Sequence, residues 1–381
     1  MEQIYLDNAA TSYPKPTQVA EQMAQYITQV GATINRSVYG RAQQAAEITL
    51  ELRIRLAKLF GVQSATHVIL TPGNTWGLNM LLFGALKPGD HCIVSAMEHN
   101  AVMRPLQHLT QKGITFTRIR CDAYGRIDLH HLESLIQQNT RLVVVAHGSN
   151  VCGTVQDAKA IGEICNQHEI PFCLDAAQTA GHIPIDFAEL GLSALSIPAH
   201  KGLMGPQGIG ALLLKPDFAK TLEPWVHGGT GSASHEEVTP NYMPDRFEPG
   251  TPNMPGIFGW NGALQYLEEV GLEQIMAHEK ELCEYFLQEL AGIKGVKLVG
   301  MPTTEQRTGV FSLDFSPKDN AEVAWQLEDR YGILTRCGLH CAPSAHKTLG
   351  TFPNGTVRFS FGWFTTKEQV QAALKAIREL V

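Results

Sequence analysis

The sequence predicts an α/β protein with a mostly parallel central sheet, followed by a smaller α+β part. Between about residues 67 and 198, short apolar runs alternate with longer segments of helical spacing. Several of these runs stop directly at a polar or charged residue, as expected where strands of a parallel sheet reach a ligand-binding edge. Beyond residues 250–252 the alternation becomes less strict. We therefore expect a large domain over 15–255 and a small domain over 256–381, with residues 1–14 packed against the small one.

Composition limits the possible functions. The chain has 381 residues, a formal net charge of -7, 44% hydrophobic and 18% charged residues, and no apolar run long enough to cross a bilayer. It has no basic block, so neither nucleic acid nor an anionic membrane surface is favoured as a partner. The first seven residues lack the features of a secretory signal, which predicts a cytoplasmic location. In that compartment the eight cysteines are expected to be core residues or working thiols.

The N-terminal region and the alternating region can be divided into elements in order. Pro14 and Pro16 favour an irregular segment before the first helix. The patterns then predict helices over 17–30, 42–60, 75–85, 101–112, 129–138 and 157–168. They predict strands over 67–70, 92–95, 115–119, 142–146, 170–174 and 194–198, with a glycine-containing loop over 202–210.

The C-terminal region has a different pattern. Apolar residues recur at helical spacing over 256–290, which predicts a long helical region. Strands are expected near 310–315, 333–335 and 356–361, and a final helix over 366–380.

Two reactive side chains come just after neighbouring apolar runs. Asp175 ends the run over 170–174, and Lys201 follows the run over 194–198. A lysine can form a Schiff base with an aldehyde cofactor, and a carboxylate can hold a protonated pyridine nitrogen. This pair therefore suits pyridoxal 5'-phosphate. The alternative from these two residues alone is a helix-capping Asp175 and a solvated Lys201.

Other strand ends carry polar side chains that favour the cofactor interpretation. Residues 71–77 join a strand to a helix with glycine, asparagine and threonine, which suits either an ordinary helix cap or a phosphate site. His99, Asn150, Gln178 and His200 follow further strands or lie next to the first pair. Five strand ends thus converge, and the sequence predicts a pyridoxal phosphate site.

The same residues carry a resemblance to a known family. The motifs are Tyr5–Thr11, Thr71–Thr75, Glu98–Asn100, Ser149–Thr154, Asp175–Gln178, His200–Lys201 and Arg246–Pro252. Together they resemble the class V aminotransferase group over nearly the whole chain. The resemblance implies the aspartate aminotransferase-like fold, known as fold type I. It also implies a homodimer with active sites at the subunit interface.

The resemblance also implies residue roles. Lys201 resembles the Schiff-base lysine and Asp175 the partner of the pyridine nitrogen. His99 resembles the residue stacked on the cofactor ring. The remaining implied cofactor contacts are Gln178 and Asn150 at the ring, Asn74, Thr75 and His200 at the phosphate, and Thr251 at the phosphate of the other subunit.

The C-terminal loop indicates which reaction the protein is expected to catalyse. Residues 336–343 place Cys341 in a turn-rich loop, and Arg358 lies in the strand expected at 356–361. An arginine fork suits a carboxylate. The loop and strand resemble the SufS-like cysteine desulfurases, which implies a persulfide on Cys341 and L-cysteine held by Arg358 and Asn150. The alternatives are a selenocysteine lyase and a non-catalytic sulfur carrier or assembly scaffold. A desulfurase would pass its sulfur to an acceptor, expected to be a protein.

Three positions depart from the family pattern, and one loop allows a second interpretation. Pro198 replaces a usual serine, Asn74 a common threonine and Leu339 a usual histidine. Four potential metal ligands, Cys337, His340, Cys341 and His346, lie within ten residues, but their spacing matches no common zinc finger or ribbon. We therefore predict no metal. His340 is a candidate proton carrier or an ordinary surface histidine.

Overall fold

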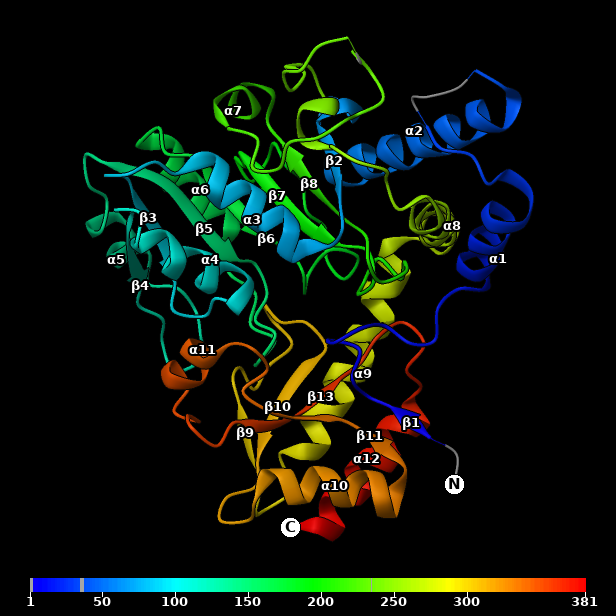
Figure 1. Cartoon of the computed structure of the whole chain (residues 1–381). Helices are drawn as coiled ribbons and strands as arrows, with labels where there is room; N and C mark the ends of the chain where they lie inside the picture. Colours follow the sequence, from blue (N-terminus) through cyan, green and yellow to red (C-terminus); the bar gives the residue numbers. More distant parts are fainter. Residues whose placement is uncertain (1–2, 35–37, 234) are drawn as a thin grey trace.

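A central sheet organises the larger part of the molecule (Figure 1). The computed structural model describes residues 3–34, 38–233 and 235–381. The seven strands lie in the order β2-β8-β7-β6-β5-β3-β4. Their bounds are β2 Val68–Thr71, β3 His91–Ser95, β4 Thr115–Ile119, β5 Thr140–Ala146, β6 Phe172–Asp175, β7 Ala194–Pro198 and β8 Gly210–Leu214.

The sheet is parallel except at β8. Strands β4, β3, β5, β6 and β7 pair in parallel, whereas β8 pairs antiparallel with both β7 and β2. The glycine-containing segment after Lys201 was expected to be all loop, but Gly210 begins β8. A side chain at Gly210 would meet the carbonyl of Ile197 and the start of the helix that follows β2, at Asn74. Glycine therefore lets the β8 strand pass close to that helix start.

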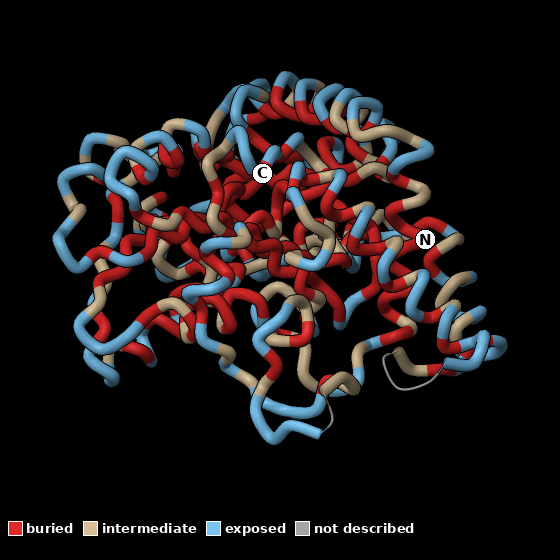
Figure 2. The backbone as a smooth tube through the Cα atoms, turned by 90° about the horizontal axis from the view of Figure 1, so that it is seen from above, coloured by how far each residue is buried: buried red, intermediate tan, exposed pale blue. Residues whose placement is uncertain are grey.

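Helices cover both faces of this sheet. In β5, Val143 and Val145 belong to one buried cluster, while Leu142 and Val144 belong to another. Such two-sided burial explains the nearly continuous apolar strand runs in the sequence. Figure 2 shows buried backbone through the centre of the molecule and exposed segments around it.

Most of the helices agree with the expected ranges, but those over 216–221, 320–331 and 343–348 were not expected. Their bounds are α1 Thr17–Gln25, α2 Gly40–Phe60, α3 Asn74–Ala85, α4 Asn100–Thr110, α5 Leu129–Ser134, α6 Ala158–Gln167, α7 Pro216–Thr221, α8 Met254–Val270, α9 Leu272–Leu290, α10 Asn320–Tyr331, α11 Pro343–Thr348 and α12 Lys367–Leu380. The first helix continues as a π-helical turn, Tyr26–Val30. The long helix expected over 256–290 is two helices, because Gly271 has a φ of 84° and ends α8.

The C-terminal part has its own sheet and core. Strands β9 Lys297–Val299, β10 Val310–Asp314, β12 Arg336–Gly338 and β13 Thr356–Ser360 form an antiparallel sheet in the order β12-β13-β10-β9. Helices α9, α10 and α12 pack around a cluster that includes Phe286, Phe311 and Phe359. The protein is thus an α/β molecule with a separate C-terminal domain.

Two contacts bear on how the chain is divided. The N-terminal strand β1 Ile4–Tyr5 pairs in parallel with β11 Ile333–Leu334 of the C-terminal part. Helix α8, in contrast, packs on α1 and α2 of the larger part. The boundary near residue 255 remains a prediction.

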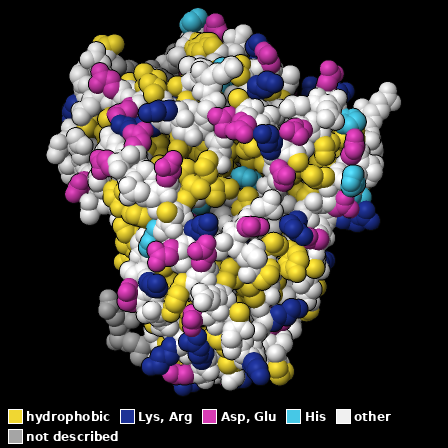
Figure 3. Space-filling model, turned by 180° about the vertical axis from the view of Figure 1, so that it is seen from behind, with side chains coloured by type: hydrophobic (Ala, Val, Ile, Leu, Met, Phe, Trp, Pro, Cys, Tyr) yellow, Lys and Arg dark blue, Asp and Glu magenta, His cyan; other side chains and the backbone are white. Residues whose placement is uncertain are grey.

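The surface is mixed in charge. Figure 3 shows Lys and Arg side chains interspersed with Asp and Glu over the rear face, with hydrophobic side chains between them. Within the described ranges, no helix combines the length and apolar character that a membrane span requires.

Candidate active site

The cavity at the carboxyl ends of β2, β3, β5, β6 and β7 brings the predicted residues together. Its volume is about 670 Å³. The predicted residues that line it are Asn74, Thr75, His99, Asn150, Asp175, Gln178, His200, Lys201, Cys341 and Arg358. The residues up to Lys201 meet because the parallel strands end at the same edge of the sheet. Cys341 and Arg358 reach the same cavity from the C-terminal part of the chain.

One wall of the cavity contains Asn74, Asp175 and Lys201, and we call these residues, together with Ser196 that bonds to Asn74, the floor. Asn74 Nδ2 donates to Asp175 Oδ1 at 2.8 Å, and Ser196 Oγ donates to Asn74 Oδ1 at 2.6 Å. The backbone N–H of Ala177 also donates to Asp175 Oδ1, at 3.0 Å. The side chain of Asn74 is therefore engaged with the floor, and its backbone begins α3, where helix N–H groups have no partner within the helix.

Burial shapes the electrostatics of the floor. Asp175 is 4% exposed, and burial raises its pKa. Burial lowers the pKa of Lys201 to about 8, although the charge of Asp175 opposes that shift. Lys201 therefore has a substantial neutral amine fraction near pH 8, which a nucleophile or general base requires.

His99 lies directly before helix α4 and is held in one orientation. Its Nδ1 accepts from the backbone N–H of Ala101 at 3.0 Å, so the side chain caps α4. Burial, followed by the charge of Lys201, lowers its pKa to about 4. The imidazole is therefore neutral at physiological pH and has a flat face suited to stacking on a planar ring.

The substrate-binding candidates are linked to one another. Arg358 on β13 is 1% exposed and pairs with Asp7 Oδ1 at 2.6 Å through Nη2. Its Nη1 donates to the backbone oxygen of Asn150 at 3.1 Å. Asn150 Nδ2 donates to the backbone oxygen of His340 at 2.6 Å, and Gln178 Nε2 donates to that of Ala9 at 3.0 Å.

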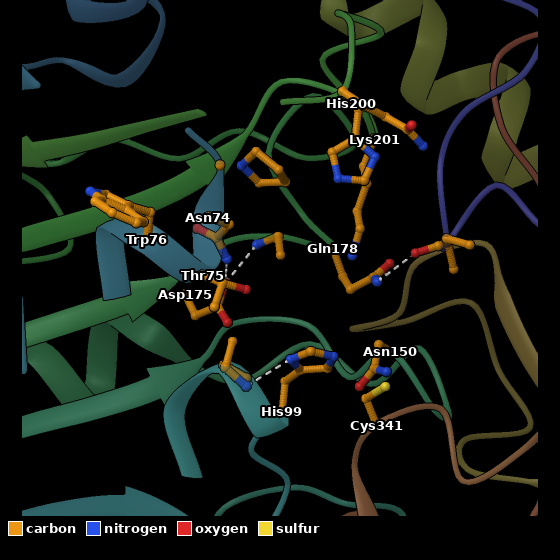
Figure 4. Close-up of a pocket in the computed structure, with 18 of the residues that line it drawn as sticks. Asn74, Thr75, Trp76, His99, Asn150, Asp175, Gln178, His200, Lys201 and Cys341 are labelled. Carbon is orange, nitrogen blue, oxygen red and sulfur yellow. Dashed lines mark hydrogen bonds between the residues drawn. The ribbon is translucent and has the colours of Figure 1, made fainter. Parts of the chain in front are cut away.

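The opposite wall contains Arg336, His340 and Cys341, which belong to a segment over 336–342 that we call the thiol loop. Cys341 is exposed, and both His340 and Cys341 have positive φ angles, 48° and 58°. Such left-handed geometry is uncommon for residues other than glycine and is frequent at functional sites. In Figure 4, Cys341 enters the cavity from the side opposite Lys201, near Asn150. Arg336 Nη2 lies 4.0 Å from Cys341 Sγ.

The other residues of the loop differ from Cys341. Cys337 lies on β12, outside the cavity lining, and burial raises its pKa. His340 is 4% exposed, so the surface interpretation of this residue is wrong. Burial lowers its pKa to about 2. In the part of the chain that the structure describes, no three His, Cys, Asp or Glu side chains cluster to hold a metal.

Thr251 does not line the cavity of its own chain. It lines a neighbouring pocket together with Thr71 and Pro249. Pro198, which replaces the usual serine, lines the cavity at the end of β7.

Several residues at the site were missed from the sequence. Arg336 lines the cavity beside Cys341, Trp76 and Trp225 line its outer part, and Asp7 pairs with Arg358. Arg336 could have been singled out, because it lies in the same turn-rich segment as Cys341. No sequence signal places Trp225 at the cavity, because it lies outside the motifs identified. Asp7 lies in the Tyr5–Thr11 motif, but nothing in that motif indicates its pairing with Arg358.

Comparisons with known proteins agree with this geometry. The aminotransferase class-V family model matches residues 4–373. A probable cysteine desulfurase from Methanothermobacter thermautotrophicus is 30% identical over 99% of this chain and 94% of its own. A cysteine desulfurase from Escherichia coli is 32% identical over 99% of this chain and 93% of its own.

Solved structures show the same similarity in three dimensions. The apo structure of a cysteine desulfurase from Thermococcus onnurineus has a TM-score of 0.92 and 33% identity, covering 100% of this chain and 94% of that one. An Escherichia coli cysteine desulfurase in an S-sulfonic acid form has a TM-score of 0.88 and 28% identity, with 100% and 95% coverage. The chain has fold type I and belongs to the class V aminotransferase family, in which it groups with the cysteine desulfurases.

Proposed function

We propose that the protein is a pyridoxal phosphate-dependent cysteine desulfurase, which converts L-cysteine to L-alanine and carries the sulfur as a persulfide on Cys341. The observation that carries this proposal is the exposed Cys341 thiol on a left-handed turn at the cavity, facing the floor that holds Lys201. A thiol that only supported the core would be buried, as Cys92, Cys165 and Cys173 are.

The residues of the cavity fit the cofactor. Asp175 is a buried carboxylate for the pyridine nitrogen, His99 offers a flat neutral ring, and the start of α3 offers free N–H groups for the phosphate. Within the described residues, His200 Nδ1 is buried without a hydrogen-bond partner, which suits an anion contact. When bound, the cofactor would supply an electron sink for the negative charge that develops at the substrate Cα.

The protein's own groups would carry out the remaining steps. Arg358 and Asn150 would hold the substrate carboxylate, and Lys201, with a pKa of about 8, would remove the Cα proton and return protons later. The Cys341 thiolate would attack the substrate sulfur, so that an S–S bond forms as the C–S bond breaks. The electron pair of that bond would remain on the carbon fragment, which becomes alanine on protonation.

We further propose that the protein works as a homodimer and passes its sulfur to an acceptor protein. Thr251 lies outside the cavity of its own chain, which supports a phosphate contact made in the partner subunit's site. The exposure of Cys341 supports delivery to a protein, because a second thiol must reach the persulfide.

The test compares two cysteines of the same loop. Cys341→Ala should lower alanine release from L-cysteine by about 100-fold or more, because the sulfur then has no nucleophile to accept it. The matched control Cys337→Ala should keep the parent rate, because that thiol lies outside the cavity lining. Alanine is measured with a thiol reductant present, so that the persulfide is cleared in each turnover.

Assays with selenocysteine as a second substrate distinguish a cysteine desulfurase from a selenocysteine lyase and from a scaffold. A selenol is a better leaving group than a thiol, so Cys341→Ala should keep most of its activity on selenocysteine. Parent protein that releases alanine only from selenocysteine would indicate a lyase, and protein inactive on both would indicate a scaffold. If Cys341→Ala matched the parent on L-cysteine while Cys337→Ala did not, the persulfide would belong on Cys337.

A further inference from the structure

The carbonyl of His200 receives an unusual number of hydrogen bonds from the N-terminal segment. Thr11 Oγ1 donates at 3.0 Å, the Ser12 backbone N–H at 3.0 Å and Ser12 Oγ at 3.3 Å. Lys15 Nζ donates at 2.8 Å and also contacts Ser12 Oγ at 2.8 Å. A carbonyl oxygen has two lone pairs, so these donors saturate it.

That carbonyl belongs to the peptide bond that leads directly into Lys201. The peptide unit is planar, so a fixed His200 oxygen also fixes the nitrogen and Cα of Lys201. On the far side, the carbonyl of Lys201 accepts from the N–H of Met204 at 2.8 Å. The backbone on both sides of the Lys201 side chain is therefore held, and the N-terminal segment holds one of those sides.

Lys15 is the charged member of this set. It is half-buried, and within the described residues it has no carboxylate partner, so its ammonium group is directed at neutral oxygens. Burial lowers its pKa to about 8. A charged donor binds a carbonyl more strongly than a neutral one does. Burying an amine is costly unless it is hydrogen-bonded, and both hydrogen bonds of Lys15 lie at the His200 carbonyl or at Ser12, which also holds that carbonyl.

The same segment reaches the other functional side chains. Asp7 pairs with Arg358 at 2.6 Å, and the backbone oxygen of Ala9 accepts from Gln178 at 3.0 Å. The N–H of Ala9 donates to Ser360 Oγ on β13 at 2.9 Å. One short segment therefore connects the Lys201 loop of the larger domain with the Arg358 strand of the smaller one.

We propose that Lys15 is a positioning residue, which clamps the His200 carbonyl and so sets the place from which the Lys201 side chain reaches the reacting carbon. This inference rests on the proposed function only in taking Lys201 as the group that moves protons. Lys15 itself does not line the cavity. Its effect is therefore transmitted through the backbone, and substrate binding at Arg358 should be largely unaffected.

The experiment compares Lys15→Met, which keeps the length of the side chain without the ammonium group, with Lys15→Arg, which keeps a charged donor. Lys15→Met should lower kcat for alanine release by about 10-fold to 100-fold, because a small displacement of a catalytic group has that effect, while KM for L-cysteine stays within about 3-fold. Lys15→Arg should recover most of the loss. The control Lys220→Met removes an exposed lysine paired only with Asp217, and should match the parent.

A second measurement does not depend on turnover. Hydrogen–deuterium exchange, followed by mass spectrometry of the peptide covering residues 199–205, should be faster in Lys15→Met than in the parent or Lys220→Met. The proposal is overturned if exchange and kcat both match the parent. It is also overturned if Lys15→Met lowers both the melting temperature and kcat, and Lys15→Arg restores neither the melting temperature nor kcat. Lys15 would then only support folding. A parent protein that releases no alanine would sink the desulfurase proposal, and the exchange comparison would still decide the role of Lys15.

Discussion

The floor and the thiol loop face each other across one cavity, yet their side chains are held very differently. On the floor, Asp175 accepts from Asn74 and from the backbone of Ala177, and Asn74 accepts in turn from Ser196. Across the cavity, Cys341 is exposed, and the Arg336 guanidinium lies 4.0 Å from its sulfur. The difference teaches that the floor holds its side chains in a fixed geometry, whereas the thiol loop leaves its sulfur exposed, as the proposed delivery to an acceptor protein would require.

Loss of the floor amine should have the largest effect. Lys201→Ala should reduce alanine release from both L-cysteine and selenocysteine by about 1,000-fold or more, because both substrates need the same proton transfers. Cys341→Ala should separate the two substrates instead. Alanine assays on both substrates measure this, and borohydride reduction followed by peptide mass spectrometry should place the cofactor label on Lys201 in the parent. Label on another lysine would contradict the assignment.

Disruption of the floor network should cost stability as well as activity. Asn74→Ala removes a donor from buried Asp175 and an acceptor from Ser196, which should destabilise the fold by about 1–3 kcal/mol. The same change should raise the pKa of Asp175 further, since the hydrogen bond from Asn74 opposes the effect of burial. We expect alanine release to fall by about 10-fold as that carboxylate becomes easier to protonate.

A substitution in the thiol loop should have the opposite outcome, with a loss of activity but not of stability. Cys341→Ala removes an exposed side chain and should leave urea unfolding unchanged within about 0.5 kcal/mol. The contrast between a rigid floor and an open thiol loop would be wrong if Asn74→Ala had the same urea midpoint of unfolding as the parent. It would also be wrong if Cys341→Ala had a clearly lower midpoint.

The smallest effect concerns acid stability. Burial lowers the pKa of His340 from 6.5 to about 2, so the folded state holds it neutral while the unfolded state protonates it below pH 6.5. The stabilisation is therefore complete above pH 6.5 and is lost progressively as the pH falls toward 2. His99, His147, His200 and His346 have pKa values lowered to about 4 and act in the same direction.

Thermal melts should reveal this dependence. The melting temperature should fall by at least about 5 °C between about pH 7 and about pH 5. His340→Gln should make that fall shallower, because one proton-binding group is removed from the unfolded state. An equally steep fall in the variant would show that His340 does not contribute to it.

Much of the fold could be predicted from local patterns, and the errors have local causes. The strand ending at Asp175 and the helix beginning near Asn74 followed from apolar runs with polar ends. The break at Gly271 was missed because hydrophobic spacing continues across it, although the backbone there has a positive φ. Strand β8 was missed because its first residue, Gly210, is the last of four closely spaced glycines, a pattern that is typical of loops.

The sequence by itself determined which side chains lie at the carboxyl ends of the strands, since an apolar run and the polar residue that follows it are local features. Lys201, Asp175, His99 and Asn150 could therefore be assigned to one edge of the sheet from local patterns alone. Only the tertiary structure decided which segments far apart in the chain meet there. The pairing of Asp7 with Arg358 and the clamp of Lys15 on the carbonyl of His200 join residues 351 and 185 positions apart. No periodicity encodes such contacts, because they depend on how the N-terminal segment packs between the two domains.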